Sequence, residues 1–421
     1  MELKKYKLAD IAKIEISGVD KKTIEGETPV RLCNFVDVYY NWAITKEKAK
    51  SFMVASAKQT EIDKCSIGKG MVAITKDSET RDDIGVATYI ADDFEDVLLG
   101  YHCALITPNP AVVDGKYLNA FMHTRYIQKY FENNASGSGQ RYTLSNDTIG
   151  NIPVLIPSIE EQRTIGKVLA DIDCKIELNK LINDNLEAMA KQLYDYWFVQ
   201  FDFPNEEGKP YKSSGGTMVW NEKLKRKIPQ EWSNGILSDV ANITMGQSPD
   251  GSSYNEDGEG IIFYQGSTDF GLRFPDIRQY TTSPSRYANK GDILMSVRAP
   301  VGALNIANND CCIGRGLSAL SSKIGSMTHL YYLMNDFRLK FEGMNSAGTT
   351  FGSITKNELF SLPVIIPTKS VFSEFEQVCE PIFYKQMIIG EEINALTKQR
   401  DELLPLLMNG QASVNYHLSD D

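Results

Sequence analysis

The feature that most constrains the fold of this chain is an internal repeat. Residues 8–12 (LADIA) return as residues 237–241 (LSDVA), and each copy closes on nearly the same phrase, IPVLIP at 152–157 and LPVIIP at 362–367. Between these landmarks lie short β-branched and aromatic runs, typical of strands, and amphipathic helical stretches. The sequence therefore predicts two similar globular domains of mixed α/β (α+β) fold, related by a pseudo-twofold internal repeat.

A long amphipathic segment follows each copy. Ser158 opens the first segment as an N-cap, and Glu161 is placed to complete a capping box. In the second segment Pro405 and then Gly410 are expected to end the helix. The predicted division is module 1 (residues 1–157), first long helix (158–200), central connector (201–233), module 2 (234–367), second long helix (368–410) and C-terminal tail (411–421).

Neither long helix can bury its apolar stripe alone. The stripes follow heptad spacing, so we expect the two helices to pair with each other as an antiparallel coiled coil; a coiled-coil homodimer is the alternative that the sequence leaves open. Asn179 and Asn183 lie on the seam, where polar residues cost stability but fix the register. The apolar positions assigned to helix pairing and partner binding are Ile165, Leu169, Ile172, Ile176, Leu186, Leu193, Phe375, Ile382, Ile389 and Leu396.

Composition favours a cytoplasmic protein. The seven cysteines are scattered and include no C-x-x-C pair, as is usual in a reducing compartment. No apolar run approaches the roughly 18–20 residues that span a bilayer, and the lysine-rich start lacks an apolar signal core. A net charge of −11 argues against a simple nucleic-acid binder.

The central connector carries a specific resemblance. Residues 194–205 (YDYWFVQFDFPN), 208–216 (GKPYKSSGG) and 228–232 (IPQEW) resemble the central region of specificity subunits of type I restriction–modification systems. The opening of the first long helix, residues 157–162 (PSIEEQ), and the whole repeat plan are similar to the same family. The resemblance extends over nearly the full chain, and the connector carries its most specific motifs.

The resemblance implies a DNA-recognition role. Each module would be a target recognition domain that reads one half of a bipartite sequence in double-stranded DNA. The paired helices would set the distance between the half-sites and dock two methyltransferase (modification) subunits, with restriction (translocase-nuclease) subunits as optional further partners. The second helix opens on Pro367-Thr368-Lys369 instead of the Ser-x-Glu-Glu-Gln phrase, which leaves open whether the two methyltransferase contacts are equivalent.

The motifs of the expected chemistry are absent from the sequence. It contains no Asn/Asp-Pro-Pro-Tyr pocket for adenine methylation and no Walker A lysine motif, and its four histidines lack metal-ligand spacing. We therefore predict that the chain is not an enzyme by itself and binds no cofactor or metal, with S-adenosylmethionine held by the partner methyltransferase. A non-enzymatic coiled-coil scaffold whose modules bind protein is the alternative function.

Loop residues are the candidates for reading DNA. Arg and Lys suit guanine in the major groove, Asn and Gln suit adenine, and such side chains work best from loops on a rigid scaffold. Residues 136–143 (SGSGQRYT) offer this mixture, and 346–353 (SAGTTFGS) are their counterpart without a cation; ordinary connectors are the alternative for both. The candidate DNA-binding residues are Gln140, Arg141, Tyr142, Lys58 and Arg81 in module 1 and Gln247, Gln265, Arg298, Arg315 and Thr350 in module 2.

Overall fold

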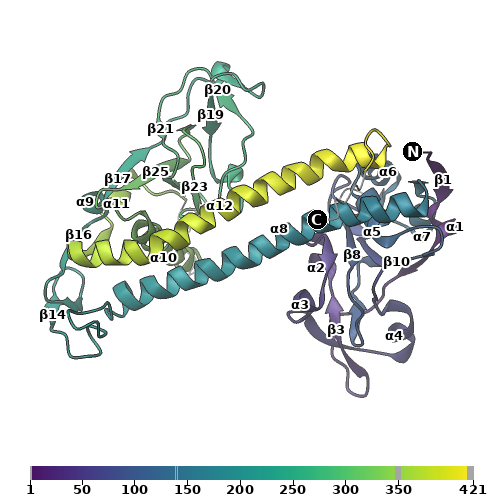
Figure 1. Ribbon diagram of the computed structural model, residues 1–421, viewed down its shortest axis with the longest axis horizontal. Helices are drawn as coiled ribbons and strands as arrows, with labels where there is room; N and C mark the ends of the chain where they lie inside the picture. Colours follow the sequence, from purple (N-terminus) through teal and green to yellow (C-terminus); the bar gives the residue numbers. More distant parts are fainter. Residues whose placement is uncertain (1, 138, 140, 347–351, 415–421) are drawn as a thin grey trace, which may run out of the picture. The chain divides into compact units, whose positions relative to one another are not determined.

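The computed structural model describes residues 2–137, 139, 141–346 and 352–414. It divides into two compact units (Figure 1). Unit 1 comprises the residues up to Leu178 together with those from Asn394 onward, and unit 2 comprises Asn179–Ile393. Module 1 therefore belongs to unit 1 and module 2 to unit 2, and each long helix contributes one part to each unit.

Module 1 is built on a five-stranded sheet with the strand order β2-β10-β6-β8-β4. Module 1 also contains three smaller sheets, β5-β3-β9, β11-β12-β7 and β1-β13. The elements of module 1 are β1 (Lys4–Lys7), α1 (Leu8–Ile11), β2 (Ala12–Ile16), β3 (Thr28–Cys33), α2 (Phe35–Tyr39), β4 (Ala43–Ile44), α3 (Lys46–Ala49), β5 (Met53–Ala57), α4 (Gln59–Cys65), β6 (Val72–Thr75), β7 (Asp77–Ser78), β8 (Ala87–Ile90), β9 (Val97–Leu99), β10 (Cys103–Pro108), α5 (Gly115–Met122), α6 (Arg125–Asn134), β11 (Ser136–Gly137), β12 (Tyr142–Thr143), α7 (Asn146–Gly150) and β13 (Pro153–Ile156).

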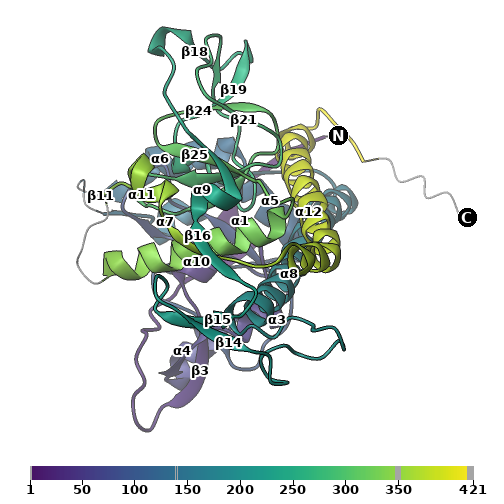
Figure 2. The ribbon, with the colours of Figure 1, turned by 90° about the vertical axis from the view of Figure 1, so that its left-hand side faces the viewer.

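Unit 2 repeats this plan. The connector forms the hairpin β14-β15, and module 2 contains the sheets β16-β26, β17-β25-β22-β23 and β18-β20-β19-β24-β21. In Figures 1 and 2, β19 lies at one end of this unit and the connector strand β14 lies at the other. Its elements are β14 (Met218–Asn221), β15 (Arg226–Pro229), β16 (Ser233–Ile236), α9 (Leu237–Val240), β17 (Ala241–Met245), β18 (Tyr254–Asn255), β19 (Ile261–Tyr264), β20 (Tyr280–Thr281), β21 (Tyr287–Ala288), β22 (Ile293–Ser296), β23 (Leu304–Ile306), β24 (Cys311–Ile313), β25 (Leu317–Ser322), α10 (Met327–Ser346), α11 (Lys356–Phe360) and β26 (Pro363–Ile366).

The sequence repeat corresponds to a structural repeat. In each module the first strand pairs antiparallel with the last, as β1 with β13 and β16 with β26. The strand order β2-β10-β6-β8 returns as β17-β25-β22-β23. The short helices α1 and α9 follow the first strand in each copy, and α7 and α11 precede the last. The repeated phrases therefore lie at equivalent places, which confirms the predicted duplicated α/β architecture.

Each module packs a sheet against helices. In unit 1 the fully buried strand β6 packs with α5 and α6, and three residues near the end of the second long helix, Leu404, Leu407 and Met408, belong to the same core. In unit 2 the sheet containing β22 packs against α10. The C-terminal part of the second helix is thus an integral part of the core of unit 1.

The segment that resembles the specificity subunits forms an aromatic core of its own in unit 2. Phe203 stacks between Tyr211 and Trp232, at ring-centroid distances of 4.7 and 4.9 Å. Phe198 lies 4.8 Å from Phe375 of the second long helix. Aromatic burial of this kind stabilises a core strongly. The motif residues of the connector therefore hold the connector to the helices.

The first long helix is α8 (Ile159–Tyr194), extended by a π-helical turn (Asp195–Val199), and the second is α12 (Lys369–Met408). The predicted capping box is present: Ser158 Oγ accepts from Glu161 N, and Ser158 N donates to Glu161 Oε2 at 3.1 Å. Within unit 2 the helices run antiparallel, because Asn179 of α8 bonds to Glu392 of α12 at 3.0 Å whereas Trp197 meets Phe375. The expected pairing within one chain is therefore confirmed there.

An arginine fastens each module to the helices of its own unit. In unit 2, Arg273 of module 2 lies over the ring of Phe383 and donates to Gln386 on α12 at 3.1 Å. In unit 1, Arg400 of α12 lies 5.0 Å from the ring centroid of Trp42 and 3.5 Å from Asp173 on α8. Each of these contacts is made within one unit, Gln386 belonging to unit 2 and Arg400 to unit 1.

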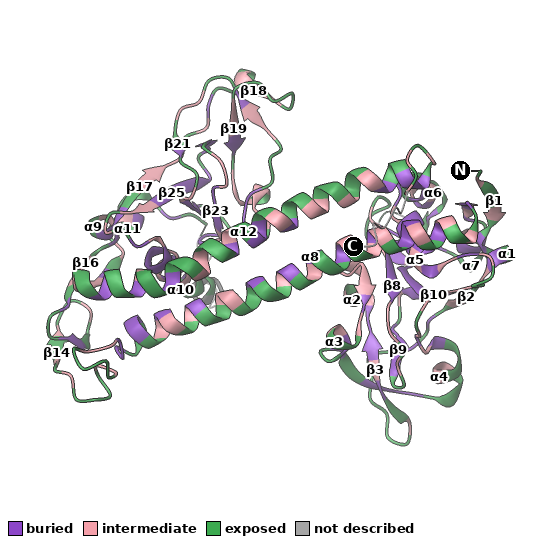
Figure 3. Ribbon diagram, viewed as in Figure 1, coloured by how far each residue is buried: buried purple, intermediate pink, exposed green. Residues whose placement is uncertain are grey.

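The seam positions assigned to pairing are used inside the chain. Ile165, Leu169, Ile176, Phe375 and Ile389 are buried, and Ile172, Leu186, Leu193, Ile382 and Leu396 are partly buried. The five buried positions pack inside the chain, and the assignment of the ten residues to partner binding stays a prediction. Figure 3 shows exposed residues along both long helices, and these outward positions are the ones a partner can reach.

Two helices depart from the pattern of their sequence. The amphipathic stretch of residues 115–133 is divided into two helices, because Thr124 has an extended backbone, caps the start of α6 and donates its hydroxyl to Phe121 O at 2.7 Å. Pro405 does not stop α12, which continues to Met408. The missing N–H of Pro405 removes one helical hydrogen bond, and burial of the neighbouring apolar side chains outweighs that loss. Gly410 does take the left-handed conformation expected after a helix, with φ 76°.

Candidate nucleic-acid interface

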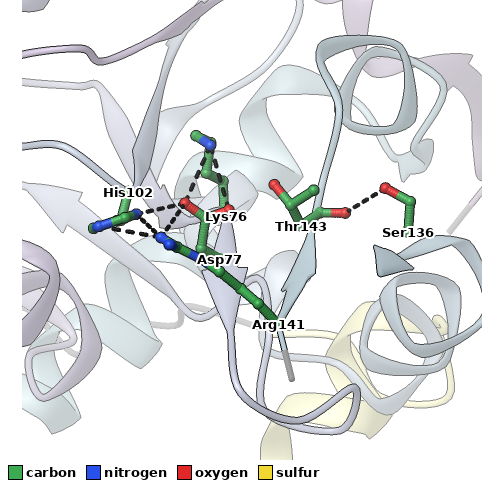
Figure 4. Close-up of polar contacts among 6 residues, drawn as sticks. All are labelled: Lys76, Asp77, His102, Ser136, Arg141 and Thr143. Atoms are coloured by element: carbon green, nitrogen blue, oxygen red, sulfur yellow. Dashed lines mark hydrogen bonds and ion pairs between the residues drawn. The ribbon is translucent and has the colours of Figure 1, made fainter. Parts of the chain in front are cut away.

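Arg141 of module 1 lies in a polar cluster with Asp77, His102 and Lys76 (Figure 4). The loop that carries Arg141 joins β11 to β12, and β12 pairs with β7, which begins at Asp77. Asp77 Oδ2 lies 2.6 Å from His102 Nδ1, 3.1 Å from Lys76 Nζ and 3.4 Å from Arg141 Nη2. The hairpin therefore places an exposed arginine over a carboxylate whose side chain is only 9% exposed.

The charge state of Asp77 follows from its contacts. Burial alone favours the neutral carboxyl, but hydrogen bonds from Thr143, His102 and Lys76 favour the carboxylate and outweigh burial, so the pKa of Asp77 is lowered. The group is therefore ionised at neutral pH and holds the cations around it.

The other candidates of module 1 are divided between two places. Arg81 lies 5.0 Å from the ring centroid of Tyr142, next to Arg141 in the chain, so the structure brings these three residues together. Lys58 is the residue before α4, beside the separate sheet β5-β3-β9, and no contact described in the structure joins it to this cluster. Gln140 lies outside the described residues.

Module 2 brings its four described candidates together at the level of the backbone. The loops that carry them meet around residues 314–316. Gln247 N donates to Ile313 O at 3.0 Å, and Gly316 N donates to Gln265 O at 3.3 Å. Val297 N, beside Arg298, donates to Gly316 O at 2.9 Å. Gln247, Gln265, Arg298 and Arg315 are all exposed, so four separate loops present polar side chains from one place.

The two modules use equivalent backbone positions with opposite charges. In module 1, Leu144 N donates to Lys76 O and Asp77 pairs with Thr143. In module 2, Ile354 N donates to Val297 O and Arg298 pairs with Ser353. Arg298 therefore occupies the place that Asp77 occupies in module 1. Thr350 lies outside the described residues.

Sequence reasoning missed Asp77 and His102. Asp77 directly follows Lys76, which the repeat places at the end of an apolar strand, but an acid at a strand end is common on any surface. His102 has a left-handed backbone, φ 74°, and no sequence pattern predicts that conformation for a histidine. Only the pairing of β7 with β12 brings both residues to Arg141.

The described residues contain no group of three His, Cys, Asp or Glu side chains placed to hold a metal ion. None of their helices is both long and apolar enough to span a bilayer.

Gly246 offers a test of the loop assembly in module 2. A Cβ atom there would lie 2.1 Å from Gly314 O and 2.8 Å from Leu317 O, so the backbone would have to move. We expect Gly246→Ala to displace the loops of Gln247 and Arg315 and to destabilise the module by about 1–3 kcal/mol, as overpacking does.

Equilibrium denaturation and DNA-binding competition would measure both effects. The matched control is Gly251→Ala, where the added Cβ meets nothing within 4 Å. Equal behaviour of the two variants would contradict the close approach of these loops.

The comparison with known proteins identifies the family. Residues 1–188 and 229–399 match the model of the type I restriction modification DNA specificity domain. These stretches make up most of the chain, which therefore belongs to that family.

Individual relatives agree with this assignment. The chain is 29% identical over 374 residues to a Methanocaldococcus jannaschii protein named as the type I restriction enzyme MjaX specificity subunit, covering 86% of this chain and 83% of that one. It is 23% identical over 400 residues to the type I restriction enzyme HindI specificity subunit of Haemophilus influenzae, covering 79% and 85%. The crystal structure of a type I restriction–modification S subunit from M. genitalium shares the fold, with a TM-score of 0.60, 14% identity and 96% coverage of each chain.

Proposed function

We propose that this chain is the DNA-recognition subunit of a type I restriction–modification complex, with module 1 (residues 1–157) and module 2 (residues 234–367) each reading one half of a bipartite target. The observation that carries this proposal is the duplicated fold with converging loop side chains in each copy. Module 1 offers Arg81, Arg141 and Tyr142, and module 2 offers four exposed Arg and Gln side chains from adjoining loops. Two different sets of donors on one scaffold suit two different half-sites.

The long helices have a second role in this proposal, as the spacer between half-sites and the platform for two methyltransferase subunits. Outward apolar side chains support the docking role. In unit 2, Leu181, Met189 and Tyr384 are 52%, 53% and 66% exposed on the helix pair. A partner subunit that covered these helices would remove these apolar side chains from water, which favours docking there.

Catalysis in this proposal belongs to the partners, all in the cytoplasm. The methyltransferase subunits bind S-adenosylmethionine and modify the DNA, and restriction subunits join complexes that cleave it. Phosphate neutralisation by these partners also accounts for the net charge of −11 on the recognition chain.

The test is to produce the full chain with the methyltransferase encoded beside it and to map modified adenines across a plasmid library. Two short specific blocks around a fixed non-specific gap are expected. A single continuous motif would mean that only one module reads DNA, and no modification would favour the coiled-coil scaffold.

The scaffold alternative makes a different prediction in a filter-binding experiment. A scaffold retains random duplexes equally with and without methyltransferase. A recognition subunit shows partner-dependent, salt-sensitive retention of particular sequences, because phosphate contacts release counterions.

Removing one arginine from each module should separate the half-sites. We expect Arg141→Ala to weaken reading of one half-site and Arg315→Ala to weaken reading of the other, by about 1–3 kcal/mol each if the side chain contacts a base edge. Both side chains are exposed, so the fold should be retained. Competition binding with duplexes mutated in one half-site at a time would show the effect, and a loss in both half-sites from either variant would contradict the division of labour.

A further inference from the structure

Arg141 is the most exposed cation of the module 1 cluster, and Asp77 and His102 anchor its guanidinium. Arg141 Nη2 lies 3.4 Å from Asp77 Oδ2 and 3.2 Å from His102 Nε2, whereas the Arg141 side chain as a whole is 57% exposed. Figure 4 shows the guanidinium reaching back along the hairpin to these two residues. Because Asp77 is also held by Lys76, the anchor is itself fixed.

The remaining donors of Arg141 stay available. Within the described part of the chain, Nη1 and Nε have no partner. Nη2 meets Asp77 Oδ2 and both ring nitrogens of His102, and these acceptors adjoin one another, since Asp77 Oδ2 lies 2.6 Å from His102 Nδ1. One Nη2 hydrogen is shared among them, and the second is left. A bidentate contact with guanine needs two parallel N–H groups directed at O6 and N7. An arginine anchored through one Nη2 hydrogen retains such a pair.

The carboxylate distinguishes a base contact from a phosphate contact. A negative group 3.4 Å from the guanidinium offsets the positive charge that a phosphate would feel, so Asp77 is a disadvantage for binding the DNA backbone. A guanine edge is neutral, and recognising it depends on the orientation of the guanidinium plane. Anchoring therefore favours base reading.

His102 is held in place at a cost in backbone energy. Its φ of 74° is a left-handed conformation that non-glycine residues rarely adopt. The turn is secured by Lys76 N, which donates to His102 O at 2.8 Å, and by the ring of Tyr101 at 4.1 Å. Backbone strain of this kind persists where the surroundings fix a residue, commonly at binding sites.

We propose that Arg141 reads a guanine in the half-site of module 1, and that Asp77 and His102 are positioning residues that orient its guanidinium. This inference rests on the proposed function. It also explains why the two modules differ at one backbone position: module 1 has the anchor Asp77, whereas module 2 has Arg298, which is exposed and contributes a cation directly. We therefore expect the two half-sites to be read by different side-chain arrangements, an anchored arginine in module 1 and an unanchored one in module 2.

The test compares the recognition motifs of four proteins, each the full chain with its methyltransferase: the unaltered chain, Asp77→Asn, Arg141→Lys and Asp96→Asn. We expect a fixed guanine in one half-site of the unaltered chain. In Asp77→Asn the preference for that guanine should fall about tenfold, within the range that one bidentate contact supplies. All other positions, and the second half-site, should be unchanged.

Arg141→Lys guards against a folding defect in Asp77→Asn. Its side chain is exposed, and lysine keeps the charge but lacks the fork for guanine, so the same position should lose its preference. Asp96→Asn is the matched control, because Asp96 pairs with Arg31 at 2.6 Å elsewhere in module 1 and should leave the motif unchanged.

Two outcomes would overturn the proposal. If Arg141→Lys leaves the guanine preference intact, or weakens binding equally for all sequences, Arg141 is not a base reader. If the module 1 half-site of the unaltered chain contains no fixed guanine, the contact does not exist. A motif with no bipartite form would instead reject the proposed function itself, so the two failures can be told apart.

Discussion

Replacing Phe375 with alanine should lower the free energy of unfolding of unit 2 by about 3–5 kcal/mol, the range for truncating a buried phenylalanine. Phe375 is fully buried, and its ring lies 4.8 Å from Phe198 and 5.6 Å from Trp197. The substitution removes this aromatic contact between α12 and the end of α8 and leaves a cavity that the surrounding rings cannot fill. Denaturation followed by tryptophan fluorescence would report it, since Trp197 and Trp232 belong to the same core.

The control for this prediction is Ile388→Ala, on the same helix and in the same unit. Its side chain is 40% exposed, so we expect a change within about 1 kcal/mol. If both variants lost equal stability, the aromatic core would not be what joins the connector to the helices.

Acid should destabilise unit 2 through His329. The ring lies 4.6 Å from Phe198 and 4.8 Å from Phe372, and removal from water lowers the pKa of His329 to about 3. The unfolded chain binds this proton at about 6.5. The free energy of unfolding of unit 2 therefore keeps its full value above that pH. It decreases as the pH falls toward 3, by about 1.4 kcal/mol for each pH unit, because the unfolded chain binds the proton more tightly than the folded one.

Native-state amide exchange in α10, measured between pH 7 and 4.5, would follow this loss. We expect His329→Phe to flatten the dependence below pH 6.5 in unit 2, because a phenyl ring cannot bind the proton. Unit 1 contains a buried histidine of its own, His123, whose pKa is lowered to about 4. The substitution at His329 leaves His123 in place, so the pH dependence of unit 1 should not change. An unchanged slope in α10 would show that another group dominates.

The periodic parts of the fold could be predicted from the sequence. The heptad spacing identified both long helices, and Ser158 with Glu161 marked where the first begins. Periodicity failed where local chemistry competes with it: Thr124 interrupts an apolar helical stripe through its own backbone conformation, and Pro405 is tolerated because its neighbours are buried in the core of unit 1.

The candidate site was predictable only by residue type. Arginine and glutamine on loops pointed to Arg141, Gln265 and Arg315, but their grouping depends on pairing between distant loops. Asp77 meets Arg141 across 64 positions of sequence. Lys58 satisfied the same residue-type criterion and lies beside a different sheet, because charge alone does not say which loops converge.

The shared core of unit 1 has a consequence for how the protein is made. Leu404, Leu407 and Met408 pack with module 1, so this core needs residues that the ribosome adds more than two hundred positions after Leu178. At about 5–20 residues per second, the core of the first module lacks its last apolar side chains for roughly 12–46 s after Leu178 has been added. During that interval its incomplete core is exposed to chaperones and to other nascent chains, whereas unit 2 has all its residues before synthesis ends.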